Sequence, residues 1–226
     1  MQTLVPLNAH RHRHLKLHQQ PGWRFARAFS QCALVLDEFA RAALHYPIAF
    51  VRQGEGWLPV ALLSRGGEGN AYVGPDGRWR APYVPLSVRT HPFLLARAPG
   101  GELPVVCIDH RSELLSSEHG APLFDMHGEQ APALARVLDS LGEIDALRRA
   151  TEAFCQSLAM LNLLAPLPSL SGCWMVDEQA LARLPDASLC VLRAKGWLLP
   201  LYAHRISLAR LDRLPAAAGG SGGRNA

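Results

Sequence analysis

The hydrophobic pattern of the chain changes its period after Glu129, and this change constrains the fold more than any other feature. Before Glu129, short apolar runs are separated by glycine- and proline-rich turns such as Gly74-Pro75-Asp76-Gly77. After it, Leu134, Leu138 and Leu141 recur at helical spacing. The pattern predicts a β-rich first part followed by amphipathic helices.

The β-rich part contains one clear hairpin. Two β runs, residues 48–51 and 57–63, flank the turn sequence Gly54-Glu55-Gly56. A helix that Asp37 caps is expected just before this hairpin. Further short extended segments are expected at residues 4–7, 15–17, 70–73, 80–88, 93–96 and 103–108.

The later part is expected to contain several helices and two strands. Gly142 is the expected break between two long helices, because glycine weakens a helix interior. Asp177 and Asp186 are placed as N-caps of short helices, the second of which ends at Gly196. Strands are expected at residues 173–176 and 197–202, and a last helix at 207–214.

Together these elements indicate an α+β fold. We expect a twisted, mainly antiparallel sheet packed against helices, with a small C-terminal α/β annex. Residues 1–214 are expected to form a single domain, and 215–226 a flexible, glycine-rich tail.

Composition excludes several classes of protein. The 23 Lys and Arg against 19 Asp and Glu leave a net charge of only +4, so we expect no nucleic-acid partner. The sequence has no apolar stretch of about 18 residues and no secretory leader, so we expect a cytoplasmic protein without a transmembrane segment. Five widely spaced cysteines without a C-x-x-C pair favour reduced thiols, with no metal site.

Several segments together carry a family resemblance. They include Tyr46-Pro47-Ile48, Arg89-Thr90-His91-Pro92-Phe93, Cys107-Ile108-Asp109 and Gly196-Trp197-Leu198. The longest is Gly77-Arg78-Trp79-Arg80-Ala81-Pro82-Tyr83-Val84-Pro85. With these segments, residues 4–214 resemble the SapC family of bacterial proteins, which is named for a surface-layer-associated locus and is distinct from the like-named peptide-transporter permease. The resemblance implies a link to surface-layer or cell-envelope protein biogenesis, and it implies no cofactor and no catalytic residue.

Polar and aromatic side chains that suit binding are concentrated between residues 70 and 109. The candidate binding residues are Asn70, Trp79, Tyr83, Arg89 and Asp109. Aromatic side chains and arginine often anchor protein partners or planar ligands. The alternative is internal, with Arg89 and Asp109 forming an ion pair between strands and Trp79 and Tyr83 at the edge of the core.

Catalytic and metal-binding patterns are absent from the sequence. No G-x-S-x-G motif occurs, and Asp109-His110 lacks the spacing of iron-oxygenase ligands. His10, His12 and His14 alternate as in a strand, but the interleaved Arg11 and Arg13 oppose a bound cation, so a solvated edge strand is expected.

We therefore expect a non-catalytic binding or accessory protein with a protein partner and no cofactor. An enzyme or small-ligand-binding protein with a pocket around Arg89 and Asp109 is the alternative. The oligomeric state is left open.

Overall fold

The computed structural model describes residues 4–18, 22–65, 69–96 and 104–214, and the expected tail at 215–226 lies outside the described residues. The fold is α+β, with antiparallel sheets packed with helices. The chain divides into two compact units, one of residues 1–25 and 86–146 and the other of residues 26–85 and 147–226. The expectation of a single domain over 1–214 stays a prediction.

Unit 1 contains two three-stranded antiparallel sheets. In the first, β1 (Leu4–Pro6) and β6 (Phe93–Ala96) flank β7 (Val105–Asp109). In the second, β8 (Leu115–Ser116) and β9 (Ala121–Pro122) flank β2 (Lys16–Leu17). The core of the unit consists of apolar side chains from these strands and from the helix that follows, chiefly Phe93, Ile108, Leu123, Leu134 and Leu141.

Unit 2 is built on a five-stranded sheet in the order β10, β11, β4, β5, β3. The expected hairpin is present as β4 (Ile48–Gln53) and β5 (Gly56–Leu62), with Ile48 opposite Ala61 and Gln53 opposite Gly56. The edge strands are β3 (Gln31–Ala33) and β10 (Leu164–Pro166), and β11 (Trp174–Val176) lies between β10 and β4. The C-terminal part of the chain thus contributes two strands to this sheet.

The short helical elements of unit 2 follow in chain order. They are η1 (Arg24–Ala28), which begins at the end of unit 1, η2 (Leu36–Glu38), α2 (Phe39–Ala42), α5 (Glu178–Ala182), α6 (Asp186–Ala194), α7 (Leu198–Ser207) and η3 (Leu208–Arg213). Asp177 caps α5 as expected, because its carboxylate accepts hydrogen bonds from the amides of Gln179 and Ala180. Asp37 is not the cap of the earlier helix, because it lies inside η2, whose N-cap position is Val35.

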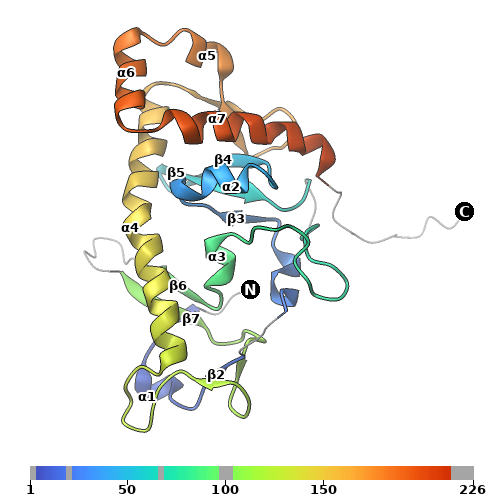
Figure 1. Ribbon diagram of the computed structural model, residues 1–226, viewed down its shortest axis with the longest axis vertical. Coiled ribbons are helices and arrows are strands. Elements are labelled where there is room, and N and C mark those ends of the chain that lie inside the picture. Colours follow the sequence, from blue (N-terminus) through green and yellow to red (C-terminus); the bar gives the residue numbers. More distant parts are fainter. Residues whose placement is uncertain (1–3, 19–21, 66–68, 97–103, 215–226) are drawn as a thin grey trace, which may run out of the picture. The chain divides into compact units, whose positions relative to one another are not determined.

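The expected helix break at Gly142 is wrong. Helix α4 (Pro132–Met160) runs through it for 29 residues, and Figure 1 shows it as one continuous helix. A glycine in a helix interior costs only about 1 kcal/mol relative to alanine. Burial of Leu141 on one side of Gly142 and of Phe154 and Leu158 on the other outweighs that cost.

The strand expected at residues 197–202 is also wrong, because this segment begins helix α7. Pro200 lies in the first turn, where the helix requires no amide donor. Leu201, His204 and Ser207 are buried at helical spacing, and α7 packs against α2, β4 and β11 (Figure 1).

Three further expected extended segments are helical or irregular. Residues 70–73 form only an isolated bridge, between Val73 and Trp79. Residues 80–88 do not form a strand, because Pro82 and Pro85 remove amide donors; the segment ends in α3 (Leu86–Arg89). The histidine-rich segment forms α1 (Ala9–His12), whose amides at His10 and Arg11 are capped by the Asn8 side chain.

His12 also differs from the expectation of a solvated arm. Its side chain is 5% exposed, and its Nδ1 lies 3.0 Å from both the amide nitrogen and the carbonyl oxygen of Asn8. Burial lowers the pKa of His12 below its ordinary value. Histidines at alternate positions therefore do not share one solvated face here.

A buried histidine joins α7 to the sheet of unit 2. His204 Nε2 accepts a hydrogen bond from the Val176 amide at 3.0 Å, so Nδ1 carries the proton and donates it to Ile48 O at 3.0 Å. Ser207 extends the joint, since its Oγ accepts the Ile48 amide hydrogen and donates to His204 O. Burial lowers the pKa of His204 to about 3, so this side chain folds as the neutral form.

Because His204 is buried as the neutral form, the free energy of unfolding depends on pH. Unfolded His204 binds a proton below pH 6.5 whereas the folded form does not, so its stabilising contribution is complete above pH 6.5 and decreases as the pH falls toward 3. We expect the difference in free energy of unfolding between wild type and His204→Gln to shrink by about 2 kcal/mol from pH 7 to pH 5. Urea denaturation at both pH values measures it. His14→Gln, at an exposed position, is the control and leaves the pH dependence unchanged; a constant difference for His204→Gln contradicts the prediction.

Candidate functional site

Three of the five candidate binding residues lie in unit 2, in a loop region that follows β5. Asn70 is buried and bridges two segments: its Nδ2 donates to Ala26 O at 3.1 Å, and its Oδ1 accepts the Tyr72 amide hydrogen at 2.9 Å. Asn70 therefore holds the loop that carries the next aromatic residues.

Trp79 and Tyr83 belong to a hydrogen-bonded aromatic network around Tyr46. Trp79 Nε1 donates to Tyr46 Oη at 2.7 Å, and the Tyr46 hydroxyl donates to the Tyr83 carbonyl. Desolvation by burial raises the pKa of Tyr46 well above its ordinary value. Tyr72 packs edge-on against Tyr46 with ring centroids 4.7 Å apart, and burial raises its pKa to about 12.

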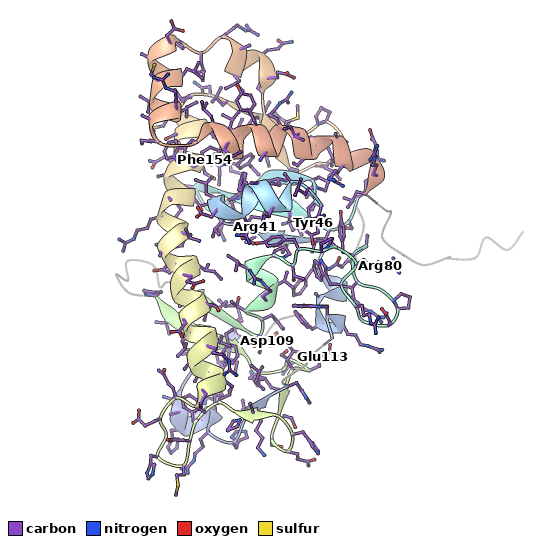
Figure 2. All side chains as sticks on the ribbon, viewed as in Figure 1. Arg41, Tyr46, Arg80, Asp109, Glu113 and Phe154 are labelled. Atoms are coloured by element: carbon purple, nitrogen blue, oxygen red, sulfur yellow. The ribbon has the colours of Figure 1, made fainter. Side chains whose placement is uncertain are left out.

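The Tyr83 side chain continues this network to a buried carboxylate. Its hydroxyl donates to Glu38 Oε1 at 2.7 Å, while Glu38 Oε2 accepts the Val35 amide hydrogen. The Arg41 guanidinium lies 5.6 Å from the centre of the Tyr83 ring, and Figure 2 labels Arg41 and Tyr46 in this region. These contacts are internal, and a further contact of Trp79 or Tyr83 with a partner stays a prediction.

The other two candidate residues, Arg89 and Asp109, lie in unit 1, which contains a cavity of about 550 Å³. Arg89 contributes to its wall, from the last residue of α3. The polar lining consists of His18, Arg89, Thr90, Arg136, Ser140 and Glu143. The apolar lining consists of Leu17, Leu86, Ala121, Ala133 and Val137.

Local contacts of the backbone position the residues that line the cavity. Thr90 closes α3, since both its amide and its Oγ1 donate to Leu86 O. On the β side, Gly120 has a φ of +116°, and a Cβ at this position would lie 2.5 Å from Leu17 O. Only glycine therefore allows β9 to approach β2 where Leu17, His18 and Ala121 face the cavity.

One face of α4 supplies the polar residues that the sequence interpretation missed. Arg136, Ser140 and Glu143 are spaced four and three residues apart, so they follow each other along the helix surface. The helical spacing of the apolar residues in this segment predicts only its core-facing side. The signal available in the sequence was this polar row beside the apolar row of Leu134, Leu138 and Leu141.

The charge of the lining favours anions. The lining contains two guanidinium groups, those of Arg89 and Arg136, and one carboxylate, that of Glu143. Both arginines are exposed, and Arg136 forms no ion pair with any described residue. The arginine fork matches carboxylate and phosphate oxygens in a bidentate way. The cavity can therefore hold an anionic group next to apolar surface.

Asp109 ends β7 and is 8% exposed. Its Oδ1 accepts the Arg111 amide hydrogen at 3.3 Å, and its carboxylate tends to raise the pKa of His91, although burial lowers that pKa overall. The ion pair between Arg89 and Asp109 stays a prediction. Asp109 is not part of the cavity lining.

The model of one protein family, SapC, matches residues 7–214. The chain belongs to the SapC family. No curated protein and no solved structure shows significant similarity to it.

Three further properties of this SapC-family chain bear on its chemistry. Across the parts of the chain that the structure describes, no helix has both the length and the apolar character needed to cross a membrane. Within the same residues, no group of three histidine, cysteine or acidic side chains is placed to hold a metal ion. The five cysteines are all free thiols, and burial raises the pKa of Cys155 to about 12.

The internal role of Tyr83 in this SapC-family protein can be measured. Tyr83→Phe removes the donor to the buried Glu38 carboxylate, so we expect a loss of about 1–3 kcal/mol in the free energy of unfolding. Tyr202→Phe, which removes an exposed hydroxyl from α7, should change it by less than about 0.5 kcal/mol. Urea midpoints give both values. Equal, small effects would show that Tyr83 has no internal role.

Proposed function

We propose that this SapC-family protein is a binding protein that holds a small anionic ligand in the cavity of unit 1. The observation that carries the proposal is the convergence of Arg89 and Arg136 on one cavity of about 550 Å³. Volumes of about 300–1,000 Å³ are usual for small-molecule sites. The proposal develops the expected pocket around Arg89 and Asp109, but its second charged residue is Arg136 of helix α4 rather than Asp109.

The lining also indicates what else the ligand carries. Leu17, Leu86 and Val137 are apolar and partly buried, so they would gain from contact with apolar ligand atoms. Thr90 and Ser140 add hydroxyl oxygens that can accept a ligand hydrogen, since their own hydrogens are donated to Leu86 O and Arg136 O. A carboxylate, sulfonate or phosphate attached to a short apolar body fits this combination of groups.

The expected protein partner remains a second proposal. It rests on the surface-layer or envelope link that the family name implies, and one surface feature supports it. Leu199, Tyr202 and Ile206 are 66%, 51% and 70% exposed and follow each other at i, i+3 and i+7 along α7. An exposed apolar row of this kind is better suited to binding a protein partner than to binding a small anion.

A pair of dyes tests the anion site directly. The anionic 1-anilinonaphthalene-8-sulfonate and the uncharged N-phenyl-1-naphthylamine share an apolar body and differ in the sulfonate. We expect the wild type to bind the anionic dye at least about tenfold more tightly, since an arginine contact contributes about 1–2 kcal/mol. Arg89→Ala and Arg136→Ala should each remove most of this preference, with less than about 1 kcal/mol of change in unfolding. Fluorescence titration measures both affinities.

Arg149→Ala is the matched control, because Arg149 is an exposed arginine on α4 that does not line the cavity. It should keep the preference for the anionic dye. The proposal is wrong if the wild type binds both dyes equally, or if the control variant loses as much as the two cavity variants.

A further inference from the structure

The turn after β7 brings a serine hydroxyl to a histidine ring. Ser112 Oγ lies 3.2 Å from His91 Nε2, although 21 residues separate them in the chain. The turn is held by the Ser112 amide, which donates to Asp109 O at 3.0 Å, and by the Leu115 amide, which donates to Ser112 O. Both Ser112 and His91 are half-buried.

The hydrogen-bond partners of Ser112 allow it to donate to the histidine. Ser112 Oγ accepts the Leu114 amide hydrogen at 3.3 Å, and its own hydrogen can be donated to His91 Nε2 when the ring proton is on Nδ1. Burial lowers the pKa of His91, so its imidazole is neutral near pH 7, and in the tautomer protonated at Nδ1 its Nε2 is the hydrogen-bond acceptor. A serine that donates to a neutral imidazole is the arrangement in which histidine acts as a general base.

Two neighbours hold the histidine in place. The Phe25 ring stacks on the His91 ring, with centroids 4.4 Å apart and planes 7° from parallel. The buried Asp109 lies beside it, because its amide donates to Pro92 O at 2.9 Å and its carboxylate acts electrostatically on the imidazole. A nearby carboxylate stabilises the imidazolium that forms when a base takes a proton. Figure 2 labels Asp109 and Glu113, which lie on either side of Arg111 and Ser112 in the chain.

We propose that Ser112 is a nucleophile that cleaves small carboxylic esters, with His91 as its general base and Asp109 as a positioning residue. This reaction goes beyond the proposed binding function and occurs outside the cavity lining. It develops the alternative expectation of an enzyme. Asp109 belongs to that expectation but does not line the cavity.

The reaction needs only the ester and water. Ser112 Oγ bonds to the carbonyl carbon while its proton passes to His91 Nε2. The bond from that carbon to the alcohol oxygen breaks, and His91 returns the proton to the departing alkoxide. Water, deprotonated by His91, then attacks the acyl group and releases the acid, and the proton restores the Ser112 hydroxyl. Ester and water thus give acid and alcohol, with no change of oxidation state.

A fluorophosphonate probe tests the nucleophile, because an activated serine displaces fluoride and forms an O–P bond. Peptide mass spectrometry of the labelled wild type locates the modified serine. We expect labelling at Ser112 to be at least about tenfold faster than at Ser116, and slow hydrolysis of p-nitrophenyl acetate. Ser116 is a matched internal reference, since its Oγ also accepts turn amides, those of Glu118 and His119, at 3.0 and 3.2 Å.

Variants then separate the roles. His91→Gln should reduce labelling of Ser112 at least about tenfold, and Ser112→Ala should remove ester hydrolysis, whereas Ser116→Ala should change neither. Asp109→Asn should move the acid limit of labelling to lower pH, because it removes the carboxylate that raises the pKa of His91. A merely structural Asp109 would leave that limit unchanged.

Labelling of Ser112 in the wild type no faster than that of Ser116 overturns the proposal without any variant, so a variant that fails to fold does not affect the test. Unchanged labelling in a folded His91→Gln protein also overturns it. The dye measurements on Arg89 and Arg136 variants are independent, so failure of this proposal and failure of the anion site are distinguishable.

Discussion

Burial of apolar side chains along α4 is the constraint on which both units depend. The first half of this helix places Leu134 and Leu141 in the core of unit 1, and the second half buries Phe154 and Leu158 in unit 2. The helix is continuous because this burial exceeds the cost of one glycine. Since the same helix carries Arg136, Ser140 and Glu143, the packing that orders the core also orders one wall of the cavity.

The candidate binding residues fall into two groups, which differ in where their polar side-chain atoms lie. Asn70, Trp79 and Tyr83 have partners inside unit 2, as polar groups near a core require. Arg89 and Arg136 keep exposed guanidinium groups beside a cavity. Because Arg89 and Arg136 line a cavity whereas the aromatic network is packed inside unit 2, the arginines support the binding proposal.

Unit 1 thus holds two chemically different features. The cavity offers charge and apolar surface, which suits reversible binding. The turn after β7 offers a hydroxyl, an imidazole and a buried carboxylate, which suits a covalent step. Both follow from the chain around α3: Arg89 and Thr90 line the cavity, and the next residue, His91, meets Ser112.

Local patterns in the sequence were enough to predict the hairpin of β4 and β5, the cap at Asp177, the termination of α6 before Gly196 and the change from sheet to helix after Glu129. These features depend on neighbouring residues: alternation, turn chemistry and a side chain that reaches its own backbone. The family, too, could be identified from short segments distributed along the chain.

Tertiary packing decided the remaining features. The strand expected at residues 197–202 is a helix because His204 and Ser207 find buried partners on β4 and β11, far away in the sequence. Likewise, Arg89 and Arg136, which line one cavity, are 47 residues apart, and the contact of His91 with Ser112 joins residues 21 apart. Sequence alone determined the fold class and the residue types available for chemistry. Which of those residues meet was decided only by the folded structure, because contacts between distant segments depend on the packing of whole elements and leave no local pattern in the chain.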